Sequence, residues 1–148
     1  FWLNAQQQLT QQGENPKRGL YISFNAVVND KATTAVQSTQ QLALWYKGPF
    51  DSRPNDSIGF GVANYLVNDR YTDRQIAINN SRGYDEYDAL AADYVPVQRD
   101  ELNVELNYTY QWSPAVMLRP NLQYIHQPAG VKEVDDAWVA GLSMRVNF

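Results

Sequence analysis

Four charged side chains occupy alternate positions in stretches where every other residue is mostly apolar. Two are acids, Glu101 and Glu105, and two are bases, Arg119 and Arg145. Carboxylates and guanidinium groups in such positions can exchange water for bidentate hydrogen bonds with a polar solute. They can equally pair with other charges as scaffolding of a polar wall, and the sequence leaves both interpretations open.

Residues for catalysis or metal binding are scarce. His126 is the single histidine and falls on the apolar side of its stretch, which disfavours a serine–histidine arrangement. The chain has no cysteine, no phosphate-binding glycine loop and no metal-spaced His/Cys set. The acidic group Asp85, Glu86 and Asp88 could share a divalent cation with lipopolysaccharide, or it could be a solvated loop face. We predict no enzyme, no cofactor and no metal site.

The elements that carry the four charges have the two-residue period of β-strands. In residues 137–148 the apolar face runs from Trp138 to Phe148, and the opposite face carries Arg145. An apolar face with an aromatic at each end is expected of the closing strand of a transmembrane β-barrel. We therefore predict an all-β, antiparallel transmembrane barrel.

Turn residues divide the chain into seven predicted strands, of which the first is the weakest. They lie at about 1–9, 20–28, 38–47, 58–66, 101–112, 116–124 and 137–148. Residues 68–100 form a long polar stretch, within which 85–92 could make a short helix.

Composition agrees with a barrel that has a wet interior and an apolar exterior. Mean hydropathy is −0.52, yet 13% of residues are aromatic. No run approaches the roughly 18 apolar residues of a membrane helix. The net charge of −4, without a basic block, argues against a nucleic-acid partner.

Charge placement favours the membrane. All four charges of the last three strands fall on the polar parity, as expected where an arginine facing lipid costs about 2–4 kcal/mol. A half-exposed sheet of a soluble β-sandwich would show the same pattern. A soluble β-barrel that binds a small apolar ligand would instead turn the Leu, Val and Tyr parity inward.

Loop lengths predict the orientation, because periplasmic turns are short and extracellular loops long. With Phe148 at the periplasmic side, 29–37, 68–100 and 127–136 lie outside. Segments 10–18, 48–56 and 113–115 lie in the periplasm. Bacterial single-chain barrels have an even number of strands, so we expect residues 1–148 to be the carboxyl-terminal portion of one larger barrel domain.

Several motifs resemble the carbohydrate-selective porin family of the OprB type. They are Glu105-Leu106-Asn107-Tyr108, Trp112-Ser113-Pro114, Leu118-Arg119-Pro120-Asn121-Leu122-Gln123-Tyr124-Ile125, Gly48-Pro49-Phe50 and Gly59-Phe60-Gly61-Val62. The resemblance implies an outer-membrane channel of about sixteen strands that passes glucose-type carbohydrates by diffusion. It also implies that Phe148 is recognised by the barrel assembly machinery. Ala115 and Ser143 depart from the family, which often carries Trp and Arg there, and Arg145 could replace the second.

The predicted pore-lining side chains are those of the polar parity. They are Tyr21, Trp45, Tyr65, Glu101, Glu105, Asn107, Arg119, Asn121, Gln123 and Arg145. The three aromatics could stack on sugar rings, or they could simply fill space against the wall. A general, non-selective channel or a small eight-stranded structural barrel remains the alternative within membranes.

Overall fold

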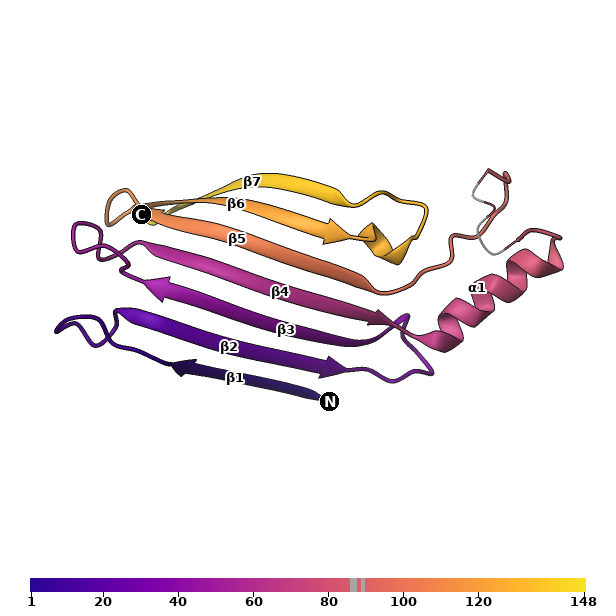
Figure 1. Cartoon of the computed structure of the whole chain (residues 1–148), viewed down its shortest axis with the longest axis horizontal. Helices are drawn as coiled ribbons and strands as arrows, with labels where there is room; N and C mark the ends of the chain where they lie inside the picture. Colours follow the sequence, from indigo (N-terminus) through magenta and orange to yellow (C-terminus); the bar gives the residue numbers. More distant parts are fainter. Residues whose placement is uncertain (86–87, 89) are drawn as a thin grey trace.

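Seven antiparallel strands form a single sheet in the computed structural model, which describes residues 1–85, 88 and 90–148. Each strand pairs with its neighbours in sequence, from β1 at one edge to β7 at the other (Figure 1). The strands are β1 (Trp2–Gln8), β2 (Gly19–Val28), β3 (Val36–Lys47), β4 (Ser57–Val67), β5 (Glu101–Gln111), β6 (Val116–His126) and β7 (Ala137–Val146). The seven predicted strands are confirmed.

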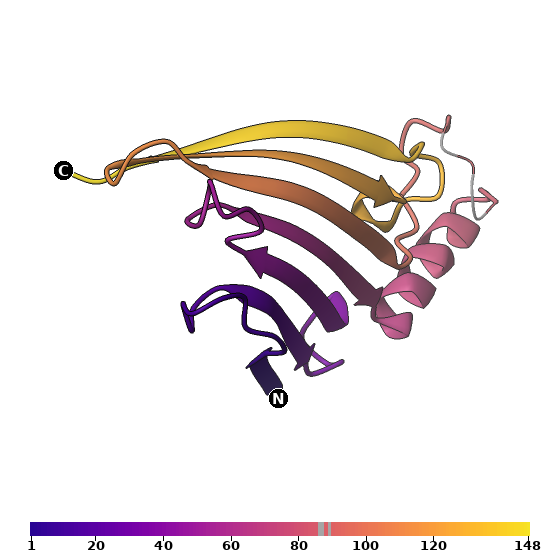
Figure 2. The same cartoon turned by 60° about the vertical axis from the view of Figure 1, so that its left-hand side comes forward.

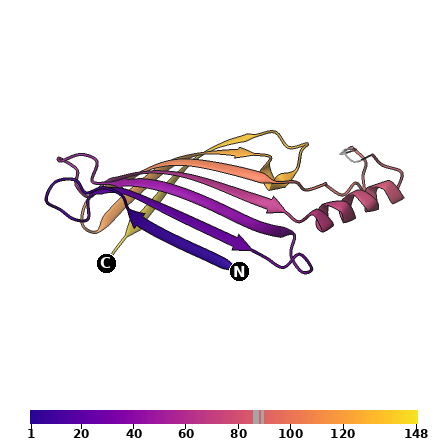
Figure 3. The ribbon, with the colours of Figure 1, turned by 60° about the horizontal axis from the view of Figure 1, so that its bottom comes forward.

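The sheet is curved as well as twisted, so it resembles a section of a cylinder (Figures 2 and 3). In the described part of the chain, β1 and β7 each pair with one strand only. An unpaired edge exposes a row of backbone N–H and C=O groups. The sheet therefore has two edges at which further strands can add.

Strand register sorts the side chains onto two faces. On one face an apolar row crosses the sheet from Ile22 to Ala140, through Leu44, Phe60, Leu106 and Leu122. Leu106, Leu122 and Leu142 on this apolar face are 52%, 45% and 70% exposed. The opposite, polar face carries rows such as Tyr21, Trp45, Gly59, Asn107, Asn121 and Gly141. Large apolar side chains thus point outward from the sheet and are not packed in a core.

Short and long connections lie at opposite ends of the sheet. Connections 9–18, 48–56 and 112–115 lie at one end, called the turn end here. Connections 29–35, 68–100 and 127–136 lie at the other, the loop end (Figure 1). Phe1 pairs with Val28 at the loop end, whereas Asn147 bonds to Ala115 at the turn end. The two chain ends therefore lie at opposite ends of the sheet, as predicted.

A 13-residue helix, α1 (Asp69–Ser81), lies in the long polar stretch, where the sequence analysis did not predict one. Its buried positions are polar: Thr72 and Gln75 bond to the backbone of Gln98, and Asn79 bonds to that of Val95. Asn68 caps the helix and also donates to the carbonyls of Lys31 and Thr34. Because the buried stripe is polar, the apolar periodicity that reveals most helices is missing.

The helix expected at 85–92 and the acidic group with Glu86 include residues 86, 87 and 89, which lie outside the described residues. No helix in the described part of the chain is long and apolar enough to span a bilayer.

A buried ion pair holds the turn end together. The Asp56 carboxylate is almost fully buried and accepts bidentate hydrogen bonds from Arg53, at 2.9 and 3.0 Å. It also accepts from the Tyr108 hydroxyl at 2.5 Å and from the Gln111 N–H at 2.9 Å. Arg53 lies 4.0 Å above the Tyr110 ring and donates to the Gln111 carbonyl. The β3–β4 turn is thereby fastened to the end of β5.

These bonds set the charge state of Asp56. Burial alone would raise the pKa of the carboxyl, but hydrogen bonds from Arg53, Tyr108 and Gln111 outweigh it and hold the pKa below its usual value. A carboxylate with a depressed pKa contributes stability that is present above about pH 4 and is lost as the pH falls through the folded-state value.

We predict that Asp56→Asn lowers the free energy of unfolding of the full-length protein in detergent by about 2–3 kcal/mol at neutral pH. The penalty is not larger because the Arg53 side chain is 34% exposed, so water can solvate the guanidinium that loses its partner. Asp51→Asn, in the same turn, is the control. Asp51 is 89% exposed and pairs with Arg18, so its loss should cost under about 1 kcal/mol. Thermal unfolding followed by circular dichroism measures both. The difference in unfolding free energy between wild type and Asp56→Asn should decrease as the pH falls below about 4. A difference that stays constant from neutral pH to below pH 3 would contradict a depressed pKa of Asp56.

Candidate functional site

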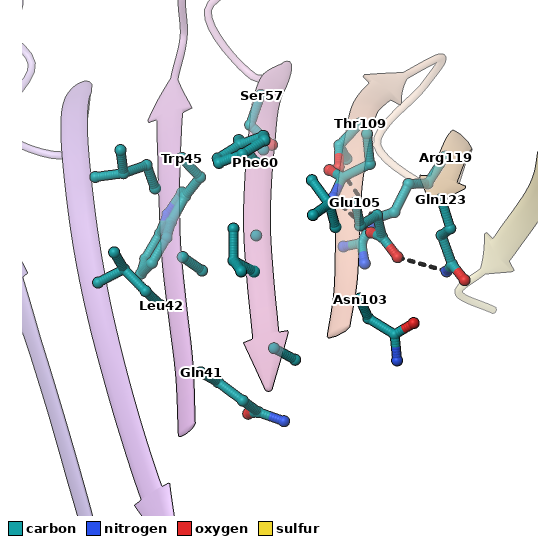
Figure 4. Close-up of a pocket in the computed structure, with 18 of the residues that line it drawn as sticks. Gln41, Leu42, Trp45, Ser57, Phe60, Asn103, Glu105, Thr109, Arg119 and Gln123 are labelled. Carbon is teal, nitrogen blue, oxygen red and sulfur yellow. Dashed lines mark hydrogen bonds between the residues drawn. The ribbon is translucent and has the colours of Figure 1, made fainter. Parts of the chain in front are cut away.

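A hollow of about 790 Å³ lies on the polar face, over β3, β4 and β5 and the adjoining part of β6 (Figure 4). Six of the ten predicted site residues line it: Trp45, Tyr65, Glu105, Asn107, Arg119 and Gln123. Gln41, Lys47, Asn55, Ser57, Asn103 and Thr109 add polar groups that the sequence analysis did not single out. All but Asn55 lie on strands at the polar parity, so the alternation itself would have found them.

Two glycines of β4 make the floor. A Cβ at Gly61 would meet no atom closer than 3.8 Å, so the space above it is open. Above Gly59 lies the Asn107 side-chain amide, whose Oδ1 would be 2.7 Å from an added Cβ. Glycine weakens a strand and often marks a place where another group approaches the backbone closely. Here the missing side chains create the depth of the hollow.

An aromatic pair forms one wall. Tyr21 and Trp45 stack with ring centroids 5.4 Å apart and planes 8° from parallel. Tyr21 donates its hydroxyl to the Lys17 carbonyl at 3.0 Å, which fixes its ring. Trp45 is paired with Tyr21 on one side and Gly59 on the other. One face of the indole is therefore covered, and the other borders the hollow above the glycine floor (Figure 4).

A carboxylate held by three amides forms the facing wall. Glu105 accepts hydrogen bonds from Asn107 at 2.8 Å, Gln123 at 2.7 Å and Asn121 at 3.3 Å. A carboxylate has about four acceptor sites, so this network fixes the group and leaves capacity for one more donor. Glu105 faces Gln123 across the β5–β6 pair, as the position of the Ser113-Pro114 turn predicted.

Arg119 lies beside this network. Its Nε donates to the Thr109 hydroxyl at 3.2 Å. Both residues lie between the register pairs Asn107–Asn121 and Tyr110–Leu118, near the predicted position. Arg119 is exposed and makes no ion pair within the described residues. Its guanidinium lies at the rim of the hollow, beside the Glu105 network.

The other predicted residues lie around the hollow and not in its lining. Asn121 donates a hydrogen bond to the lining residue Glu105, and Tyr21 stacks on the lining residue Trp45. Glu101 lies at the loop end, where it bonds to Asn103 and to the backbone N–H of Ala129. Arg145 lies on the edge strand β7. The histidine lies at the end of β6, with its Nδ1 2.8 Å from Asp136.

All 148 residues match the family model described as carbohydrate-selective porin, OprB family. The chain belongs to this family. It is 82% identical over 148 residues to "Putative porin QuiX" of Acinetobacter baylyi and 47% identical to Porin B of Pseudomonas aeruginosa. A structure of Pseudomonas putida OprB at high pH superposes with a TM-score of 0.95 and 47% identity, over 99% of this chain.

This OprB-family chain spans about a third of its relatives: 34% of the Acinetobacter protein, 32% of Porin B and 34% of the P. putida chain. The family and the fold confirm the predicted resemblance to outer-membrane β-barrel porins of the OprB type. The rival interpretation, a soluble barrel with an apolar interior, is wrong, because the chain belongs to a porin family and its apolar face is exposed.

Filling the hollow tests its role in the full-length OprB-family protein. Gly61→Leu places a side chain in open space, so we predict an intact fold and a sugar flux reduced by about half or more, because the lining and diameter of a pore set its flux. Liposome swelling with the full-length protein measures the flux. Ala140→Leu introduces the same side chain on the exposed apolar face and should leave the flux unchanged; equal effects of the two substitutions would contradict a role for the hollow.

Proposed function

We propose that the full-length protein is an outer-membrane channel for carbohydrates of the glucose type, which pass by passive or facilitated diffusion. In this proposal residues 1–148 are the carboxyl-terminal portion of the barrel wall. The polar face borders the lumen, and the apolar face contacts the acyl chains of the outer membrane. Family membership and the separation of the two faces support this orientation.

The observation that carries the proposal is the composition of the hollow. An open indole face lies on one side of a glycine floor, and a fixed carboxylate–carboxamide network lies on the other. A pyranose has apolar C–H faces and a rim of hydroxyls, so it can contact the ring of Trp45 while its hydroxyls bond to Glu105, Asn107 and Arg119. Few other neutral solutes combine these two requirements.

Weak binding suits diffusion. Conduction requires a site favourable enough to enter and weak enough to leave. The lining groups are held in place by their own hydrogen bonds, yet most of them remain partly exposed to water. A sugar would therefore replace water at fixed groups without closing a pocket around itself.

The proposed orientation places the turn end in the periplasm and the loop end outside, near lipopolysaccharide. Short turns at one end and α1 with two further connections at the other support it. Phe148 is then a fully exposed aromatic at the periplasmic side, where the barrel assembly machinery could bind it. We keep this recognition as part of the proposal.

Liposome swelling tests the function directly. We expect full-length protein to admit hexoses faster than non-sugar solutes of equal size, and Trp45→Ala to weaken glucose-induced current block in planar bilayers about two- to tenfold, the range of one aromatic contact. Trp138→Ala is the matched control, because Trp138 packs 5.1 Å from Tyr124 on the apolar face. Rates that follow solute size alone would instead identify a general, non-selective channel.

Charge substitutions test the facing wall separately. Glu105→Ala should shift ion selectivity in planar bilayers toward anions, and Arg119→Ala should shift it toward cations, since each removes one fixed charge from the lumen surface. Sugar block should weaken in both. Unchanged reversal potentials and unchanged sugar block in both variants would show that neither side chain faces the conducting path.

A further inference from the structure

A second, smaller hollow of about 200 Å³ lies on the polar face at the loop end, called the mouth hollow here. Its lining combines the ends of β3 and β4 with the residues before β5 and the short 3-10 turn η1 (Pro128–Gly130). Its lining includes Tyr65, Gln98, Arg99, Glu101, Ala129 and Gly130. It is distinct from the central hollow over β3 to β6.

The wall of the mouth hollow is fixed by hydrogen bonds. Glu101 accepts from the Ala129 N–H at 2.5 Å with one oxygen and from Asn103 at 2.8 Å with the other. The Arg99 N–H donates to the Gly130 carbonyl at 2.6 Å. A Cβ on Gly130 would lie 2.0 Å from the Arg99 carbonyl oxygen, and its φ is +69°. Only glycine allows the two segments to approach this closely.

The helix fixes the other side of the same wall. Gln98 donates from its side chain to the Ala129 carbonyl at 3.1 Å, while its backbone is bonded to Thr72 and Gln75 of α1. The β6–β7 connection, the segment before β5 and α1 are thus connected as one unit. A ligand entering the mouth hollow would not need to order a loop, which lowers the entropic penalty of binding.

Tyr65 is common to both hollows. It lies opposite Thr39 on β3 and Glu101 on β5, near the loop end of β4. Within the described part of the chain its hydroxyl makes no hydrogen bond. A partly buried phenol with an unused hydroxyl presents an apolar ring and a hydrogen-bonding tip toward whatever occupies either space.

The two hollows differ in the size of solute that they can hold. Pockets that enclose drug-sized ligands measure about 300–1,000 Å³, and the central hollow at about 790 Å³ falls in this range while the mouth hollow at about 200 Å³ does not. The smaller space fits one ring and not an oligosaccharide.

We propose that the mouth hollow is a second solute site, which holds a single hydroxylated ring such as a monosaccharide before it reaches the central hollow. Tyr65 contacts the ring in both positions and links the two sites. This inference rests on the proposed function, since it assumes that the polar face borders the lumen.

The test uses full-length protein inserted with known orientation in planar bilayers, with glucose added to one side at a time. Analysis of current noise gives association and dissociation rates for each side. We expect Tyr65→Phe to slow glucose association from the loop end about two- to tenfold, the range of one hydrogen bond. Association from the turn end, where the central hollow is met first, should change less. Tyr65→Ala should slow glucose association from the loop end further, because it removes the ring as well as the hydroxyl.

Tyr46→Phe is the matched control, because Tyr46 lies on the apolar face in register with Leu20 and Ile58. Equal association rates for wild type and both Tyr65 variants, with glucose block intact, would overturn the mouth site and leave the proposed function standing. Absence of glucose block in the wild-type protein would instead overturn the proposed function itself. An equal slowing from both sides would assign Tyr65 to the central hollow alone and would also overturn the mouth site.

Discussion

Strand register is the constraint on which the rest of the structure depends. Side chains alternate between faces, so a shift of one residue in any strand would move its whole apolar set to the polar face. Register is held at the turn end by side chains that bond across connections. Arg18 donates to the Gly48 carbonyl, and Arg53 with Asp56 fastens the next turn to Gln111. These side-chain bonds therefore help to hold the register at the turn end, together with the apolar pattern of the strands.

The central hollow is a consequence of register across several strands. Trp45, Gly59 and Asn107 come from three strands and form a site only because the pairing places them in one row. The glycines provide depth, and the neighbouring amides lean into the remaining space. A wall built this way has functional groups in fixed positions without a closed pocket, which is the arrangement that fast exchange of a solute requires.

Much of this could be predicted from the sequence, because a strand's period and its turn residues are local. The seven strands, the two faces and the opposition of Glu105 and Gln123 follow from counting. Helix α1 could not be predicted, because Thr72, Gln75 and Asn79 bury amides and a hydroxyl against another segment's backbone. The role of Glu101 was also beyond a local pattern, since its partner Ala129 is 28 residues away. The hollow itself depends on Gly59 meeting Asn107, and nothing in either strand alone indicates that contact.

The ion pair with an almost fully buried member lies at the turn end, whereas the ion pairs of the described residues at the loop end are exposed. At the turn end, ionised groups are paired and one carboxylate is almost fully buried, which makes the loss of one partner expensive. At the loop end, neutral amides and hydroxyls of α1 bond to backbone groups of the segment before β5. Neutral bonds of this kind each contribute about 1 kcal/mol, and they place no added charge beside the mouth hollow. A solute would nevertheless meet charged side chains at both hollows, Arg99 and Glu101 at the mouth and Glu105 and Arg119 further along the wall.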